Sequence, residues 1–375
     1  MIGYPDVSKA KRLRELDFLR GLAILLVLVR HRHITDFTSE MGWIGVDLFF
    51  VLSGFLVSGL LFKEYQKFGS VKPVHFLIRR GFKIYPIYFI FYIPYLIPKI
   101  VNGEFMLFPF LGDMFFIQNY VSGWGYGYGA SWSLAIEEHF YFGLAILLWM
   151  GFSKGFIVQN KNTMLSVKGL SIDKLILFIM MACVLFRLAS NYLFPNAYDR
   201  NFTMTHLRID SLLAGVLISF FFHFNREVLQ NIYNKYKYAL LVIAIGCLSW
   251  TPFFVAITSV FVKTIGFSLL YIAFGIILLY FIISKRINQD LNKIFSRPVT
   301  NAISYIGFCS YSIYVIHQFI NWSFDAVAEK MDLHMSLLPG FIIPVLLSIL
   351  AGMLMTYKVE HYFLSIRSRY FPSRA

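Results

Sequence analysis

Long apolar runs separated by short polar segments dominate the chain. A helix of about 20 apolar residues is needed to cross the hydrocarbon core of a bilayer, and ten runs near that length can be placed along the sequence. This pattern predicts an all-α, polytopic integral membrane protein with about ten transmembrane helices. The predicted helices lie near residues 17–34, 42–62, 83–100, 132–151, 174–193, 206–224, 238–256, 264–284, 302–322 and 336–357.

The composition agrees with this prediction. Hydrophobic residues make up 58% of the chain and charged residues only 14%, which is more apolar surface than a soluble domain could bury. The three cysteines lie inside apolar runs without metal-ligand spacing, so we expect no metal site. No signal-peptide cleavage site follows the first run. We expect residues 1–375 to form a single transmembrane domain with no soluble catalytic domain attached.

The chain has a net charge of +14, and the positions of its basic residues indicate its membrane topology. If the N-terminus is cytoplasmic, 25 of the 34 lysines and arginines fall in segments on the inner side. The positive-inside rule then places both termini in the cytoplasm of a multi-pass protein of the cell inner (plasma) membrane. The basic residues form no continuous face and no RNA-binding motif, so we expect no nucleic-acid partner.

The first apolar run carries a charged or titratable residue at each end. Arg20 and His31 are separated by about three helical turns, which places both on one helix face roughly 16 Å apart. The pair offers a cation at one level of the membrane and a general base at another. If this stretch is considered without the rest of the sequence, the same residues could also be interfacial anchors at the two ends of an ordinary transmembrane helix.

A pair of carboxylates, Glu137 and Glu138, lies about two turns inside the fourth predicted helix. Carboxylates in a membrane are costly unless they line a hydrated cavity or meet a partner. Counting helix rise from the membrane surfaces puts Glu137 at nearly the depth of His31, and a carboxylate there would orient the imidazole and raise its basicity. The alternative is an ion pair that only joins two helices.

Two further predicted helices begin with polar residues near the outer surface. The second contains Asp47 and a Ser53-Gly54 pair, and the small pair favours tight helix packing. The sixth begins with Arg208 and Asp210. The apolar, glycine-containing stretch 101–131 between the third and fourth helices fits either a re-entrant piece at a cavity mouth or a surface loop.

Three basic residues, Arg79, Arg80 and Lys83, open the third predicted helix on the inner side. They fit positive-inside anchoring, and together with Arg20 they also fit a phosphate pocket. On the ninth predicted helix, Ser310, Tyr314 and His317 share one face. Helix counting brings His317 to the depth of His31, either as a rival base or as a hydrogen-bonding member of the same cavity.

These stretches together resemble the acyltransferase-3 family of membrane acyltransferases, which O-acylate surface polysaccharides, peptidoglycan and some small molecules. The resemblance rests on LDFLRGLAILLVLVRH (Arg20 and His31), GVDLFFVLSGF (Asp47), RRGFKIYP, SWSLAIEEHFYF, RIDSLLAG and SYSIYVIH. It departs where the family has Arg-x-x-Arg and this chain has Arg80-x-x-Lys83, which replaces a bidentate contact by a point charge. Many relatives carry a fused extracytoplasmic hydrolase-like domain, which we do not expect here.

The resemblance implies an O-acyltransferase that moves an acyl group, most simply acetyl, from cytoplasmic acyl-CoA to a hydroxyl of a cell-surface or lipid-linked glycan. It implies catalytic roles for His31 and Glu137, by general base catalysis or through an acyl-histidine. A separate extracytoplasmic acyltransferase is a further conceivable partner beside the glycan and the bilayer. The competing class is a transporter or flippase. The implied donor-binding residues are Arg20, Arg79, Arg80 and Lys83, and the implied substrate-binding residues are Asp47, Trp132, Ser133, Glu138, Arg208, Asp210, Tyr314 and His317.

Overall fold

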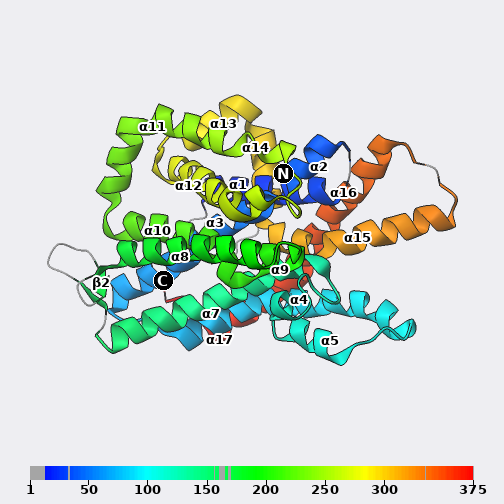
Figure 1. Ribbon diagram of the computed structural model, residues 1–375, viewed down its shortest axis with the longest axis horizontal. Helices are drawn as coiled ribbons and strands as arrows, with labels where there is room; N and C mark the ends of the chain where they lie inside the picture. The colour runs from blue at the N-terminus through cyan, green and yellow to red at the C-terminus, as the bar shows by residue number, and fades with distance from the viewer. Residues whose placement is uncertain are drawn as a thin grey trace.

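The structure is a computed structural model that describes residues 13–32, 34–155, 157–159, 165–167, 170–333 and 335–374. Most of these residues are helical, which confirms the predicted all-α class (Figure 1). The α-helices are α1 (Arg14–His31), α2 (Asp36–Gly42), α3 (Gly45–Phe68), α4 (Pro73–Val101), α5 (Leu107–Met114), α6 (Gln118–Val121), α7 (Trp132–Ser153), α8 (Ile172–Leu193), α9 (Tyr198–Thr203), α10 (Ile209–Phe224), α11 (Arg226–Leu248), α12 (Phe267–Ile283), α13 (Ile287–Phe295), α14 (Arg297–Phe308), α15 (Ser310–Lys330), α16 (Leu337–Met355) and α17 (His361–Tyr370).

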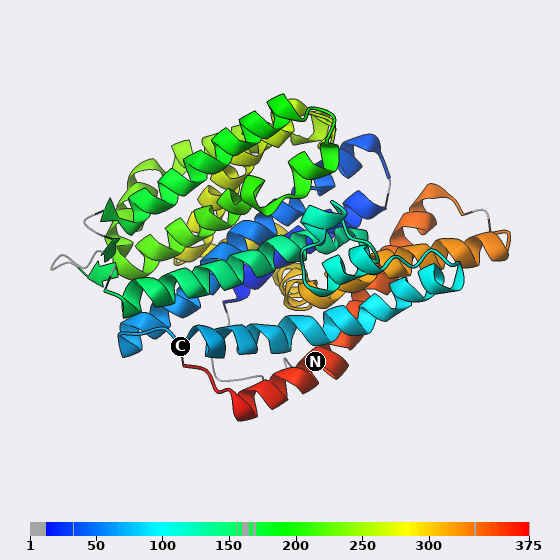
Figure 2. The same ribbon diagram turned by 60° about the horizontal axis from the view of Figure 1, so that its bottom comes forward.

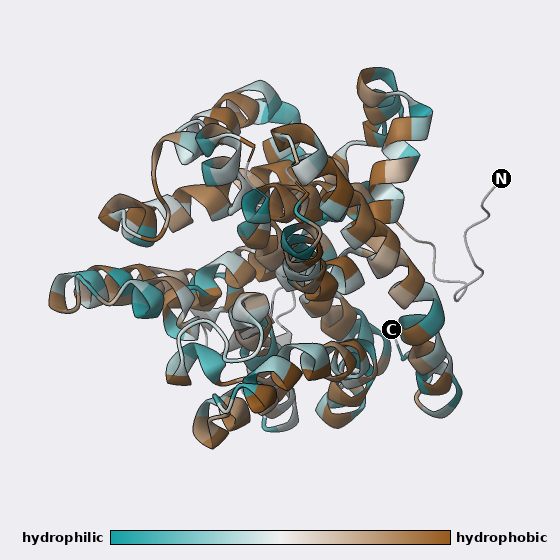
Figure 3. Cartoon of the chain, turned by 90° about the vertical axis from the view of Figure 1, so that its right-hand side faces the viewer, coloured by the Kyte–Doolittle hydropathy of each residue, from teal (hydrophilic) through white to brown (hydrophobic). Residues whose placement is uncertain are grey.

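Many large hydrophobic side chains are exposed on the helix bundle, as expected for a protein surrounded by lipid. Figure 3 shows hydrophobic residues along the outer helices. Phe178 and Val242, on α8 and α11, each leave 70% of their surface exposed. Within the described residues, six helices are long and apolar enough to cross a membrane, or seven if a bent pair counts as one span. A polytopic membrane protein is therefore confirmed, and the number of ten spans stays a prediction.

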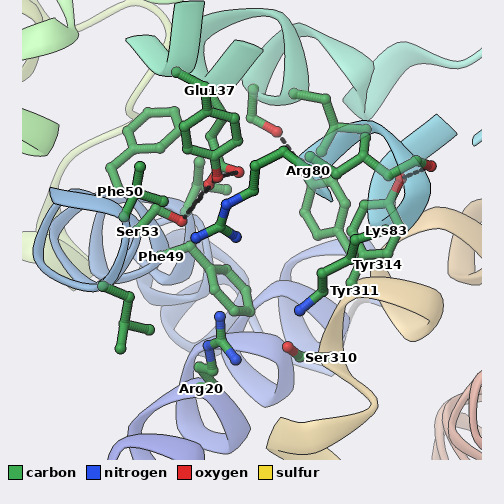
Figure 4. Close-up of a pocket in the computed structure, with 17 residues that line it drawn as sticks. Arg20, Phe49, Phe50, Ser53, Arg80, Lys83, Glu137, Ser310, Tyr311 and Tyr314 are labelled. Atoms are coloured by element: carbon green, nitrogen blue, oxygen red, sulfur yellow. Dashed lines mark hydrogen bonds between the residues drawn. The ribbon is translucent and has the colours of Figure 1, made fainter. Parts of the chain in front are cut away.

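The ninth predicted helix is broken. The structure replaces a single helix over 302–322 by α14 and α15, which meet at Cys309 with a bend of 78°. The break brings Ser310 to the start of α15, so that its hydroxyl faces the interior of the bundle (Figure 4). The prediction of one unbroken helix over 302–322 was therefore wrong. The break contains no proline that would have marked it in the sequence, and the cause of the break is tertiary packing.

Glycines bring two helix pairs to backbone contact. A Cβ atom on Gly307 of α14 would lie 1.8 Å from the carbonyl oxygen of Asp17 on α1, and one on Gly54 of α3 would lie 1.9 Å from that of Leu212 on α10. Only glycine permits such close crossings, which resemble the small-residue contacts of membrane helices. The prediction that Gly54 serves helix packing is confirmed.

The two ends of the bundle differ in structure (Figure 1). At one end, the loop after α7 forms a small antiparallel sheet of β1 (Ile157–Gln159), β2 (Leu165–Val167) and β3 (Leu170–Ser171), in the order β1-β2-β3. This sheet was not predicted. At the other end, the stretch 101–131 folds into α5, α6 and the short 3-10 helix Gly129–Ser131, designated η1.

A buried carboxylate holds the stretch 101–131 together. Asp113, at the end of α5, accepts hydrogen bonds from the Tyr92 hydroxyl at 2.8 Å and from the backbone amides of Tyr126 and Gly127 at 3.0 and 2.8 Å. Burial raises the pKa of the Asp113 carboxyl, and the amide hydrogen bonds oppose that rise. These contacts fix the loop that leads into α7, whose first turn contributes to the site.

The C-terminal segment lies along the inner part of α4 (Figure 2). Arg79 donates a hydrogen bond to the carbonyl oxygen of Phe371, His75 lies 2.8 Å from the carbonyl oxygen of Pro372, and Arg374 pairs with Glu64 at 3.1 Å. The segment after α17 is thereby held against the start of α4 and the end of α3.

Candidate functional site

Two cavities lie between α1, α3, α4, α7 and α15, one nearer each end of the bundle. We call them the inner chamber and the outer chamber, following the predicted topology. Their volumes are about 90 Å³ and about 460 Å³. The polar residues that line only the inner chamber are Arg20, Ser53, Arg80, Lys83, Ser133, Glu137, Tyr141, Ser310 and Tyr311. The lining of the outer chamber includes Arg30, His31, Trp43, Asp47, Trp124, Trp132, Arg208 and Gln318. Val46 and Tyr314 line both chambers.

Helix α1 runs past both chambers. Arg20 lines the inner chamber and His31 lines the outer chamber, so the two residues line adjoining cavities at different levels of the bundle. This arrangement follows from their spacing of about three turns on one helix face. His31, at the last turn of α1, is solvent-exposed, whereas Arg20 is half-buried.

Three cations share the inner chamber. Figure 4 shows Arg20 from α1 and Arg80 and Lys83 from α4 directed into the same space. The Arg80 guanidinium lies 5.4 Å from the ring centroid of Tyr141, a geometry that favours the cation. Arg79 does not line the chamber; its guanidinium is bound to the Phe371 carbonyl. Three of the four predicted donor-binding residues are therefore together and the fourth lies apart.

Glu137 also belongs to the inner chamber. Its carboxylate accepts hydrogen bonds from the Ser53 hydroxyl at 2.8 Å and the Tyr141 hydroxyl at 2.6 Å, as Figure 4 shows for Ser53. His31 lines the other chamber, so the predicted contact between Glu137 and His31 is absent. Helix counting put Glu137 at the depth of His31, whereas the structure places it in the inner chamber with Arg20 and Arg80. Ser53, expected to serve packing, is instead a ligand of this carboxylate.

Glu138 projects away from both chambers. It is buried and accepts a hydrogen bond from the Tyr85 hydroxyl at 2.8 Å. The structure therefore gives no support to a substrate contact by Glu138. No cluster of three or more His, Cys, Asp or Glu side chains suited to a metal ion occurs within the described ranges.

A second imidazole packs against His31. The ring centroids of His31 and His317 are 4.8 Å apart, and Gln318 Nε2 lies 3.5 Å from His31 Nδ1. His317 Nδ1 lies 2.6 Å from the carbonyl oxygen of Tyr314. A carbonyl only accepts hydrogen bonds, so Nδ1 carries the hydrogen and the buried Nε2 is left as an acceptor; no partner for it occurs in the described part of the chain.

The Tyr314 ring stands where the two chambers meet. Its hydroxyl lies 2.6 Å from the Ser133 hydroxyl and donates to the Ala130 carbonyl oxygen at 3.0 Å. The Tyr128 hydroxyl donates to the Tyr314 carbonyl, the same carbonyl that His317 contacts. Ser133 lines the inner chamber and also holds the Tyr314 hydroxyl, so the predicted members Ser133, Tyr314 and His317 form one connected group.

The remaining predicted substrate-binding residues are part of buried ion pairs. Asp47 and Arg208 are both fully buried, and Arg208 Nη2 lies 2.8 and 3.0 Å from the two Asp47 carboxylate oxygens. The Arg208 guanidinium also lies 3.5 Å from the ring centroid of Phe267 and 5.5 Å from that of Trp132. Asp47, Arg208 and Trp132 therefore form a wall of the outer chamber rather than a set of free ligands.

Asp210 belongs to a second buried pair that the sequence reasoning missed. Its carboxylate binds Arg187 Nη1 at 2.6 Å, and both side chains are fully buried. Neither residue lines a chamber. A signal for this pair was present, because Arg187 is a cation inside the apolar run of α8, where charged residues normally have a partner. Tyr141 and Gln318 were missed as well, since neither carries a charge that would mark it.

Comparisons with known proteins identify the family of the chain. A family model described as "Acyltransferase domain" matches residues 13–357. A peptidoglycan O-acetyltransferase of Listeria monocytogenes is 30% identical over 327 residues, which is 82% of this chain and 49% of the relative. A putative O-acetyltransferase of Staphylococcus aureus strain COL is 28% identical over 344 residues, covering 84% of this chain and 52% of the relative.

The chain spans about half the length of these curated relatives. A putative peptidoglycan O-acetyltransferase of Bacillus subtilis strain 168 matches more distantly, at 24% identity over 60% of this chain. No solved structure matches significantly. The similarity therefore concerns the membrane portion that contains the two chambers.

Proposed function

The chain belongs to the acyltransferase family whose model it matches, and from that premise we propose that it is a membrane O-acyltransferase. The donor is acyl-CoA, most simply acetyl-CoA, bound from the inner side. The acceptor is a hydroxyl of a cell-wall glycan on the outer side, in keeping with the similarity to the peptidoglycan O-acetyltransferase of Listeria monocytogenes. The protein resides in the bacterial plasma membrane, with both termini in the cytoplasm.

The observation that carries this proposal is the division of the site into two unlike chambers. The inner chamber contains Arg20, Arg80 and Lys83, which suit the phosphates of a coenzyme A donor because guanidinium and ammonium groups form strong charge-assisted hydrogen bonds to phosphate. The outer chamber is larger and is lined by tryptophans and an exposed imidazole, which suits an acceptor with apolar faces and a hydroxyl to be activated.

His31 is the proposed general base. It takes the proton of the acceptor hydroxyl while the hydroxyl oxygen attacks the thioester carbonyl carbon, and the C–S bond then breaks as the proton passes to the departing thiolate. The alternative route transfers the acyl group first to the His31 imidazole and then to the acceptor. In either route the thioester must reach the junction at Tyr314, where the two chambers adjoin.

In this proposal Glu137 acts in the inner chamber, where acyl-CoA binds. Its carboxylate lies with the cations of the inner chamber and is held by Ser53 and Tyr141. From there it limits the net positive charge of the chamber and helps to fix the Arg80 guanidinium, which lies over the Tyr141 ring. His317 and Gln318, rather than Glu137, are the groups that set the orientation of His31.

The test is an acyl-transfer assay on the purified protein, with acyl-CoA and soluble peptidoglycan fragments as substrates. We expect release of free coenzyme A thiol together with acylated glycan. His31→Ala should lower the rate by about 10²- to 10⁴-fold, the usual contribution of a general base, while acyl-CoA binding is retained. His361→Ala, an exposed histidine outside both chambers, is the matched control.

Two results would reject the proposal. Normal turnover by His31→Ala would remove its role as base. Movement of glycan across a vesicle membrane without consumption of acyl-CoA would favour the competing transporter or flippase, because intramembrane arginine, glutamate and histidine also mark transport pathways.

A further inference from the structure

A third cavity lies outside the helix bundle proper, between α6 and the segment around α9. We call it the outer hollow; its lining includes Asn119, Tyr120, Asn196, Tyr198, Asp199 and Arg200, and its volume is about 380 Å³. This volume falls within the range of about 300 to 1,000 Å³ that is typical of small-molecule sites. The two segments that form it are on the same side of the molecule as the outer chamber.

The lining combines aromatic rings with amides and charged groups. The side chains of Tyr120 and Tyr198 are 45% and 39% exposed, so their rings are accessible to a ligand. The Lys263 ammonium lies 4.6 Å from the centroid of the Tyr198 ring. Such a surface suits a sugar, whose C–H faces pack on aromatic rings and whose hydroxyls bind planar polar groups.

Asn119 supplies an unused acceptor at this cavity. It is fully buried, and its amide nitrogen donates to the Thr203 carbonyl oxygen at 3.1 Å and to the Thr205 hydroxyl at 2.9 Å. Its Oδ1 has no hydrogen-bond partner among the described residues. A buried amide oxygen without a partner is costly, and a ligand hydroxyl or N–H group in the hollow would relieve that cost.

The outer hollow adjoins the outer chamber through a shared wall. Trp124 lines the outer chamber, and its indole N–H donates to the Asp199 carboxylate, which lines the hollow. Gly123 lines the hollow directly beside Trp124. The ring of Trp124 also packs on Phe202, 5.5 Å between centroids, and Phe202 lines the outer chamber. A chain-like ligand that occupies the chamber can therefore reach the hollow across this wall.

We propose that the outer hollow is a second saccharide subsite, which binds a neighbouring sugar of the acceptor glycan while the reacting sugar occupies the outer chamber. The inference rests on the proposed function. It assigns a positioning role to Tyr198 and Asn196, which contact the glycan away from the reacting hydroxyl and take no part in the chemistry.

The experiment compares two acceptors, a single peptidoglycan sugar and a longer soluble oligosaccharide, with wild type, Tyr198→Ala and Asn196→Ala. Loss of one aromatic contact should raise KM for the longer acceptor roughly 3- to 10-fold, with kcat unchanged, and should leave both constants for the single sugar, which cannot reach the hollow, unchanged. Tyr198→Phe should behave as wild type. Tyr192→Ala is the control, since Tyr192 is 86% exposed near the outer end of α8 and does not line the hollow.

Equal effects of Tyr198→Ala on both acceptors, or no effect on either, would overturn the subsite. Direct binding of the longer oligosaccharide, measured without donor, separates this inference from the proposed function. Binding that weakens in Tyr198→Ala but not in Tyr192→Ala supports the subsite even if wild type consumes no acyl-CoA. Turnover by wild type with no such difference in binding rejects the subsite and leaves the acyltransferase proposal intact.

Discussion

Replacing Asp47 by asparagine should test whether this residue supports the fold or binds substrate. Asp47 accepts two hydrogen bonds from Arg208 at 2.8 and 3.0 Å and one from Ser211 at 3.2 Å. Each of the two charge-assisted bonds contributes about 1.5–3 kcal/mol, which gives about 3–6 kcal/mol for the pair. Removing one partner of a buried ion pair costs about 3–5 kcal/mol. We therefore expect Asp47→Asn to lower the free energy of unfolding by roughly 3–5 kcal/mol.

The assay is reversible unfolding in mixed detergent micelles, carried out as a double-mutant cycle. Arg208→Met removes the other charge, and the double variant should be destabilised by much less than the sum of the single effects, because no unpaired charge then stays buried. The control is Asp325→Asn. Asp325 pairs with Arg32 at the same distance of 2.8 Å but is 62% exposed, so we expect a loss below about 1 kcal/mol.

Additive effects in this cycle would refute the reasoning. So would a stable Asp47→Asn variant whose KM for the glycan acceptor rises, because that result would return Asp47 to the role of a substrate ligand.

The other predictions concern the division between the chambers. Arg20→Ala and Arg80→Ala should each weaken acyl-CoA binding roughly 10- to 150-fold in titration calorimetry. Arg79→Ala should weaken it less, because the Arg79 guanidinium binds the Phe371 carbonyl outside the chamber. Equal losses of affinity in all three variants would contradict the assignment of the inner chamber to acyl-CoA. Glu137→Gln should lower kcat/KM for acyl-CoA, and its effect should multiply with that of His31→Ala because the two side chains lie in different chambers. Strong non-additivity in initial rates would instead restore the direct partnership predicted from the sequence.

Much of the architecture could be predicted because membrane helices carry their own signal. Each of the ten predicted apolar runs overlaps a helix of the structure, since a backbone in lipid has to satisfy its hydrogen bonds within the helix. The spacing of Arg20 and His31 also gave their common direction, because both belong to one rigid helix. The break at Cys309 carries no comparable signal: it lies beside Gly307, where α14 touches the α1 backbone, and that contact depends on tertiary packing.

Contacts between different helices were harder to predict from the sequence than the helices themselves. Counting residues from the end of α7 put Glu137 at the depth of His31, whereas the structure places it in the inner chamber with Arg20. A count of residues gives neither the shift nor the rotation of one helix against another. The same limit applies to Arg208 and Asp210, which are close in sequence yet pair with Asp47 and Arg187 on two other helices. Charged residues inside apolar runs were correctly expected to have partners; their identities required the structure.

The Tyr314 ring between the chambers has a consequence for the cell as well as for the reaction. A line of cavities with cations at one level and imidazoles at another would offer protons and ions a route through the bilayer and would discharge the gradients on which a bacterium depends. Tyr314 is anchored through its hydroxyl to Ser133 and Ala130. Together with Val46, which also lines both chambers, it interrupts that route with an aromatic ring and an aliphatic side chain. Under the proposed function, an acyl group would pass this barrier while the membrane stays electrically sealed.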